Sequence, residues 1–74
     1  MTQIIVMDHT GDTRLDVDPT NELSVANAMK RFNELMEQGY TAAKRQTKNA
    51  TPEITRTYDP TAEETLFIPR LQGG

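Results

Sequence analysis

The sequence predicts a small α+β domain in which one mixed sheet of four or five strands packs against a single helix. Two continuous apolar runs, at residues 3–7 and 65–68, are typical of strands that lie inside a sheet. Between them, residues 21–38 carry the spacing of an amphipathic helix. A chain of 74 residues has room for one domain, so these segments must share one thin core.

The first two predicted strands form a β-hairpin. Residues 3–7, Gln-Ile-Ile-Val-Met, are a mostly β-branched apolar run, and Gly11 follows in a short loop. Residues 13–18 then alternate, so that Leu15 and Val17 point to one side and the charged residues point to the other. A strand with one charged face fits the edge of the sheet.

A helix is predicted over residues 21–38. Pro19 ends the preceding strand, and either Thr20 or Asn21 can cap the helix. Gly39 suits the position just after the last helical turn. The apolar residues recur mostly at steps of three and four and are expected to face the sheet: Leu23, Val25, Ala26, Met29, Phe32, Leu35 and Met36.

The second half contains three further candidate strands. Residues 40–45 have weak β-propensity because two of them are alanine. Residues 54–58 have good strand composition and alternate with a period of two. Residues 65–68 form the last strand, which ends at Pro69 because proline cannot donate to a β-ladder. The sequence leaves open whether residues 40–45 pair with 53–58 or with 65–68.

The order of these elements predicts the topology. The first and last strands are the most apolar, so both should lie in the middle of the sheet, adjacent and parallel. The helix between them supplies the long crossover that a parallel pair requires. A hairpin, a helix and further strands in this order are the layout of a β-grasp fold. We expect the folded domain to span residues 1–70, and residues 71–74 to project from it as a mobile tail.

Composition and charge exclude several functional classes. The chain has no cysteine and only one histidine, His9, which excludes thiol catalysis and two-histidine metal sites. We therefore expect no metal, no cofactor and no enzymatic activity of its own. The net charge of −3 argues against a nucleic-acid partner, and no apolar run is long enough to span a membrane. A cytoplasmic binding, carrier or tag domain fits these constraints.

Residues at both ends of the chain resemble a known family. Within residues 1–19, the segments MTQIIV and TGDTRLDVDP closely resemble the N-terminal hairpin of ubiquitin. Residues 65–74, TLFIPRLQGG, resemble the last strand and tail of ubiquitin, with one residue fewer between Leu66 and Arg70. The middle of the chain matches only in the order of its elements. The chain is thus similar to ubiquitin-like proteins, including bacterial ones that share the fold and the Gly-Gly end.

This resemblance implies a function for the last residues. In this family an ATP-dependent activating enzyme, called E1-like, adenylates the terminal carboxylate, which here belongs to Gly74. The glycyl group then passes to a cysteine of the E1-like or an E2-like protein, and finally to a target amine. Gly73 and Gly74 lack side chains and so fit a narrow active-site channel. The residues that the activating enzyme is expected to recognise are Arg70, Leu71 and Gln72. A JAB-type peptidase is a further expected partner.

Two departures from the ubiquitin pattern concern recognition by other proteins. His9 stands where ubiquitin has the leucine at the tip of its hairpin loop. Residues 42–44, Ala-Ala-Lys, contain no isoleucine to complete the apolar recognition patch of the family.

Two other functions stay open at this point. A sulfur carrier uses the same adenylation but ends in a thiocarboxylate at Gly74. A non-covalent β-grasp adaptor binds its partner instead through the edge strand near residues 13–18, or through an exposed face of the last strand around Phe67. In an adaptor the Gly-Gly end is incidental.

Overall fold

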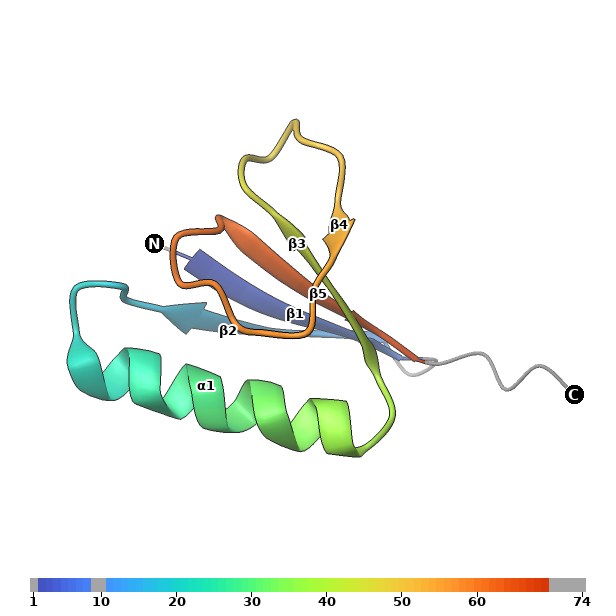
Figure 1. The fold of residues 1–74 in the computed structure, drawn as a ribbon, viewed down its shortest axis with the longest axis horizontal. Coiled ribbons are helices and arrows are strands. Elements are labelled where there is room, and N and C mark those ends of the chain that lie inside the picture. The colour runs from blue at the N-terminus through green and yellow to red at the C-terminus, as the bar shows by residue number, and fades with distance from the viewer. Residues whose placement is uncertain (1, 9–10, 70–74) are drawn as a thin grey trace, which may run out of the picture.

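The computed structural model describes residues 2–8 and 11–69, which form one five-stranded sheet with a single helix against one of its faces (Figure 1). Across the sheet the strands follow the order β2-β1-β5-β3-β4. Along the chain the elements are β1 (Thr2–Asp8), β2 (Gly11–Val17), α1 (Glu22–Glu37), β3 (Thr41–Arg45), β4 (Glu53–Ile54) and β5 (Glu64–Ile68). The predicted α+β class is confirmed, and the arrangement is compatible with a β-grasp fold.

β1 is paired on both sides. It runs antiparallel to β2 over all seven residues of each strand, which confirms the predicted hairpin. It runs parallel to β5, with Val6 opposite Phe67, which confirms that the first and last strands are parallel neighbours. At the start of β2, Gly11 has a φ of +129°, a conformation that residues with a side chain rarely adopt.

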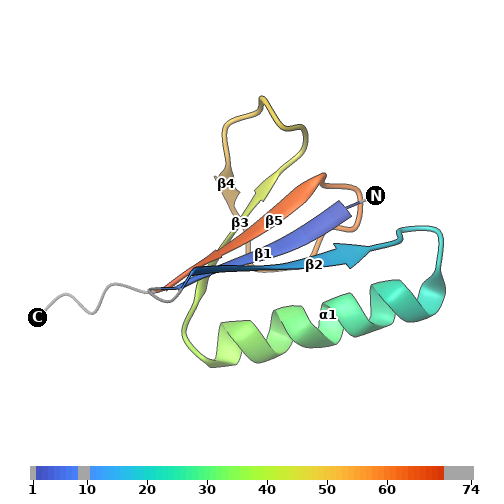
Figure 2. The ribbon, with the colours of Figure 1, turned by 180° about the vertical axis from the view of Figure 1, so that it is seen from behind.

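β3 settles the pairing that the sequence leaves open. It lies between β5 and β4 and runs antiparallel to both, with Ala43 opposite Leu66 on one side and opposite Ile54 on the other. The connection between β3 and β4 projects from the sheet on the side away from α1 (Figure 2). The predicted strand at residues 40–45 is therefore present despite its alanines.

The predicted strand at residues 54–58 is wrong beyond Ile54, because β4 is only two residues long. Thr55 donates one backbone hydrogen bond to the carbonyl of Ala42 (2.9 Å) and then turns away from β3. Its hydroxyl donates to the carbonyl of Thr57 (2.8 Å) and so forms a local turn that competes with the ladder. The chain then carries Tyr58 down to the helix, where its ring lies 5.9 Å from that of Phe32.

Both ends of α1 are fixed by the local interactions that the sequence predicts. The side chain of Asn21 accepts hydrogen bonds from the N–H groups of Leu23 (3.0 Å) and Ser24 (3.2 Å), as a helix N-cap does. At the other end, Gly39 has a φ of +94° and donates to the carbonyl of Met36 (3.1 Å). Tyr40 then donates to the carbonyl of Leu35 (3.2 Å), which completes the C-terminal cap.

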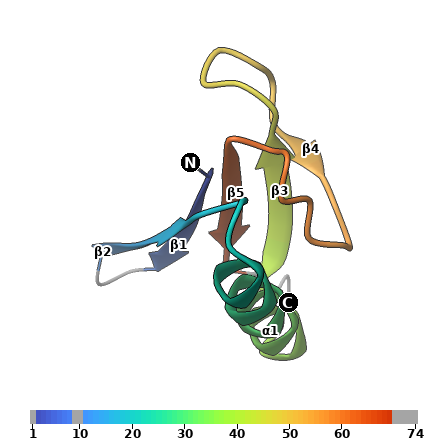
Figure 3. The same ribbon diagram turned by 90° about the vertical axis from the view of Figure 1, so that its left-hand side faces the viewer.

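The buried face of α1 is narrower than its apolar pattern predicts. Ala28, Phe32 and Leu35 are buried, but Met29 is 50% exposed and Leu23 is 75% exposed. Leu23 precedes Phe32 by about two and a half helical turns, so the two side chains point in opposite directions. Viewed along its axis, the helix lies beneath β5 and β3, and β2 extends beyond it (Figure 3). The helix therefore covers only part of the sheet.

Phe67 lies at the centre of the core. Its side chain is fully buried, and it packs edge-on against the rings of Phe32 (5.1 Å between centroids) and Tyr40 (6.5 Å). Residues from the sheet and the helix surround this aromatic cluster: Ile4, Val6, Val17, Ala28, Leu35 and Ala42.

We predict that Leu35→Ala destabilises the fold strongly and that Leu23→Ala does not. Leu35 is 1% exposed, so truncation leaves a cavity and should lower the free energy of unfolding by about 2–5 kcal/mol. Leu23→Ala makes the same change on the exposed side of the same helix and should stay within about 0.5 kcal/mol of the parent chain. Denaturant unfolding of the two variants measures this difference, and equal losses would contradict the placement of the helix.

Candidate functional site

The residues predicted to carry conjugation lie outside the described part of the chain. They are Arg70, Leu71, Gln72, Gly73 and Gly74; His9 also lies outside it. What the structure describes is the element that leads into them. β5 ends at Ile68, and Pro69 follows as an exposed residue outside the sheet. The surface around the end of β5 is therefore the candidate recognition surface.

Alternation along the strands assigns each side chain to one of two sheet faces. Ile4, Val6 and Phe67 belong to the core cluster and so point toward α1. Their neighbours in sequence point to the opposite face, which no described helix covers and which we call the open face. Leu66 and Ile68 therefore lie on the open face of β5.

An apolar patch lies on the open face beside the end of β5. At its centre are Ile5, Ala43 and Leu66, which are opposite one another on β1, β3 and β5 and are each less than a tenth exposed. Ile54 (71% exposed) and Ile68 (43% exposed) border them. These five residues are called the open-face patch below.

Ile54 adds an isoleucine to the open face beside residues 42–44, which contain none themselves. It lies on β4 directly opposite Ala43 and points to the same face of the sheet. The isoleucine beside β3 on this face therefore comes from β4 and not from residues 42–44. Ile54 is present in the sequence, but its position opposite Ala43 depends on where the chain turns after residue 45.

A row of polar side chains borders the open-face patch at the other end of β5. The Nε2 atom of Gln3 donates to Asp16 on β2 (2.8 Å). On the other side of β1, Glu64 begins β5 opposite Gln3, and its carboxylate accepts from Nε of Arg45 on β3 (2.8 Å). Glu64 is only 8% exposed, so its pairing with Arg45 compensates a largely desolvated carboxylate. The open face thus changes from polar to apolar along β5.

Phe67 itself is not part of the expected exposed face of the last strand. Phe67 points toward α1 and is fully buried, so no partner can reach it without opening the core. Both of its neighbours are apolar, and the apolar run itself does not say which residue faces the helix. The exposed apolar side chain of β5 is Ile68.

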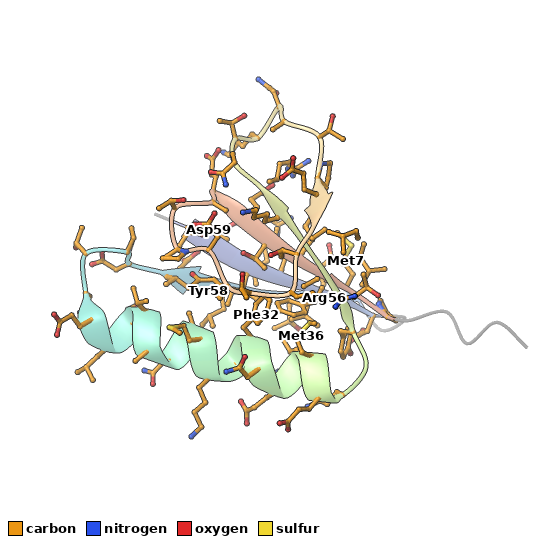
Figure 4. All side chains as sticks on the ribbon, in the orientation of Figure 1. Met7, Phe32, Met36, Arg56, Tyr58 and Asp59 are labelled. Atoms are coloured by element: carbon orange, nitrogen blue, oxygen red, sulfur yellow. The ribbon has the colours of Figure 1, made fainter. Side chains whose placement is uncertain are left out.

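The carboxylate of Asp59, labelled in Figure 4, joins the segment after β4 to Lys44 of β3. This carboxylate accepts from the N–H (2.9 Å) and hydroxyl (2.5 Å) of Thr61, and from Nζ of Lys44 (3.0 Å) and Nε2 of Gln46 (3.0 Å). Hydrogen bonds from Thr61, and then that from Lys44, hold the pKa of Asp59 well below its usual range. The sequence signal for this turn is Asp59-Pro60-Thr61, since aspartate often bonds the backbone two residues on.

Comparison with known proteins gives no match: no protein family, no curated protein and no solved structure is significantly similar to this chain.

Two features are absent from the described residues, 2–8 and 11–69. No helix among them is long and apolar enough to cross a membrane. Nor do histidine, cysteine, aspartate and glutamate side chains gather there in a group of three or more that could hold a metal ion.

We predict that Asp59→Asn lowers stability at neutral pH more than it does in acid. The folded-state pKa of Asp59 lies below the unfolded value of about 4, so its contribution is present above that pH and is lost as the pH falls toward the folded-state pKa. The difference in Tm between the parent chain and the variant should therefore shrink from neutral pH to about pH 2. Thermal unfolding across this range measures it.

Glu37→Gln is the control, because it neutralises an exposed carboxylate on the helix. Its Tm should follow that of the parent chain at both extremes of pH. A difference for Asp59→Asn that stays constant over the whole range would show that this carboxylate does not fasten the loop through its charge.

Proposed function

We propose that this chain is a ubiquitin-like protein modifier of the bacterial type, with a β-grasp fold. An E1-like enzyme activates the carboxylate of Gly74, and an E2-like protein and a JAB-type peptidase act on the product. The hairpin and tail residues that resemble ubiquitin support this proposal. The mixed sheet, in which β1 and β5 are parallel and a single helix crosses between the hairpin and β3, is compatible with it. In this proposal the chain itself is no enzyme and works in the cytoplasm.

The observation that carries the proposal is the position of β5. This strand is hydrogen-bonded on both sides, to β1 and to β3, and packs through Phe67 into the core. The sequence Arg-Leu-Gln-Gly-Gly begins one residue after Pro69, the last described residue. A tail attached to a doubly paired central strand can be pulled into an enzyme channel while the domain stays folded.

The chemistry requires three transfers of the Gly74 carbonyl. The carboxylate first attacks the α-phosphorus of ATP, which releases pyrophosphate and leaves an acyl-adenylate. A cysteine thiolate of the activating enzyme then displaces AMP to form a thioester. An amine of the target finally displaces the thiolate to form an amide. Arg70 pairs with acidic groups of the enzyme through its guanidinium fork.

We predict ATP–pyrophosphate exchange when the intact chain is mixed with the E1-like enzyme of its host. Deleting Gly73 and Gly74 should abolish the exchange, because the reactive carboxylate no longer reaches the nucleotide. Arg70→Glu should weaken it and leave the Tm nearly unchanged. Arg31→Glu, which reverses a charge on the exposed side of α1, is the matched control and should exchange like the parent chain. Equal exchange after the deletion would refute the proposal.

The same adenylation serves a sulfur carrier, and the product distinguishes the two functions. Intact mass of protein purified from its host shows whether one oxygen of Gly74 has been replaced by sulfur. Conjugates linked through lysine, with no such species, support the modifier. A thiocarboxylate without conjugates supports the carrier.

A second candidate function is that of a non-covalent adaptor, and the open-face patch favours it. Ile54 and Ile68 expose apolar surface on a face that no described helix covers. Such a surface is typical of protein-binding sites. In this case the partner contacts the patch, and the tail is not needed.

We predict for the adaptor that Ile54→Asp abolishes function and that deletion of Gly73 and Gly74 does not. Leu23→Asp is the control, because Leu23 and Ile54 are similarly exposed at 75% and 71% but lie on different surfaces. A host strain that lacks the gene, complemented with each variant, provides the measurement, and circular dichroism confirms that each variant folds. The reverse pattern, loss of function on deletion alone, would exclude the adaptor.

A further inference from the structure

β2 leaves one long edge of the sheet without a partner. It is the first strand in the sheet order and spans seven residues, whereas β4, at the opposite edge, spans two. The residues from Gly11 to Asp16 are all exposed, and β2 extends beyond the helix (Figure 3). A long unpaired edge offers backbone groups to another strand.

The hydrogen bonds of β1 identify the backbone groups that this edge presents. The N–H of Gln3 donates to the carbonyl of Glu63 (3.0 Å), so the peptide groups of Gln3 face β5. Those of the flanking residues, Thr2 and Ile4, therefore face β2, and they meet Val17 and Leu15. It follows that the odd-numbered residues of β2 bond to β1. The N–H and C=O groups of the even-numbered residues point outward: Asp12, Arg14 and Asp16.

The outward-bonding residues also carry an alternating charge. Asp12, Arg14 and Asp16 project their side chains to the open face, in the order negative, positive, negative. Arg14 forms no ion pair with any described residue, whereas Asp16 accepts a hydrogen bond from Gln3. On the helix face of the same strand, opposite Ile4, Leu15 is 43% exposed.

We propose that two copies of this chain pair through their β2 edges, antiparallel, about a two-fold axis that passes between the two Leu15 residues. In this register Arg14 of each copy is opposite Asp16 of the other. Both residues have outward-facing backbone groups, so these positions form hydrogen-bonded pairs. Two ion pairs form on the open face, and the two Leu15 side chains meet on the helix face as a close, non-hydrogen-bonded pair.

The neighbouring registers are less favourable. When Arg14 is opposite Arg14, like charges face each other, and Asp12 is also opposite Asp16. When Arg14 is opposite Asp12, the ion pairs are restored, but each Leu15 is then opposite Gly11 and has no apolar side chain to meet. When Arg14 is opposite Asp18, the two Asp16 residues face each other. Of these registers, only the proposed one combines both Arg14–Asp16 pairs with the Leu15 contact; its one like-charge pair, Asp12 with Asp18, lies beyond the end of β2 at Val17. It places both open faces on the same side of one continuous sheet.

Sedimentation velocity of the intact chain, from micromolar to millimolar concentration, tests the proposal. We expect a shift from monomer to dimer as the concentration rises. Arg14→Asp should abolish the shift by placing three carboxylates in a row on each edge. The double variant Arg14→Asp/Asp16→Arg restores opposite charges in the proposed register and should dimerise again, whereas the register with Arg14 opposite Asp12 would then be repulsive. Arg31→Asp, on α1, is the control and should dimerise like the parent chain.

Hydrogen exchange gives a second readout that does not depend on the variants. The amides of Arg14 and Asp16 should gain protection as the concentration rises, and those of Thr13 and Leu15, already bonded to β1, should not change. A monomer at every concentration overturns the proposal, as does a dimer that Arg14→Asp leaves intact. Protection of these two amides only in the presence of another protein also overturns it, because the occupant is then not a second copy.

Discussion

The packing of Phe67 against Phe32 is the contact on which the rest of this domain depends. It joins the last strand to the middle of the only described helix, and the two rings meet edge-on at 5.1 Å. Since Phe32 and Phe67 are 35 positions apart in the sequence (67 − 32), this contact closes the core and holds β5 between β1 and β3. Tyr40 and Tyr58 pack against the same cluster, so the connections after α1 and before β5 are fixed by it as well.

One face of the sheet packs into the core and the other is the open face, because successive residues of a strand point to opposite faces. On β5, Phe67 serves the core, while Leu66 and Ile68 belong to the open-face patch. Charge follows the same division. The ion pair of Lys44 with Asp59 fastens a loop on the helix side, and that of Arg45 with Glu64 lies on the open face. A tail-based modifier, a patch-based adaptor and an edge-paired dimer therefore depend on different residues of the chain.

The two edge strands differ in length, and this difference bears on assembly. β4 is only two residues long and ends where Thr55 forms a local turn with Thr57. This edge therefore presents few backbone groups to another strand. β2 is long, exposed and carries charges of both signs. Charged residues usually protect an edge from pairing with other chains. Here the alternation of sign makes the same residues selective, since only one of the antiparallel registers compared sets Arg14 opposite Asp16 and also brings the two Leu15 side chains together.

The sequence by itself determined the elements whose cause is local. The hairpin, the Gly39 cap and the parallel neighbours β1 and β5 follow from turn chemistry, helical spacing and two continuous apolar runs. The choice of Asn21 over Thr20 as the N-cap came only with the structure. Only the tertiary structure decided which side of each apolar segment is buried. β5 is apolar on both faces, so alternation cannot say that Phe67 faces the helix, and the wide apolar stripe of α1 cannot say that Met29 stays exposed. Ile54 lies on the open face because β4 pairs with β3 so that Ile54 is opposite Ala43. No local pattern encodes this register, because the register depends on packing between residues distant in sequence.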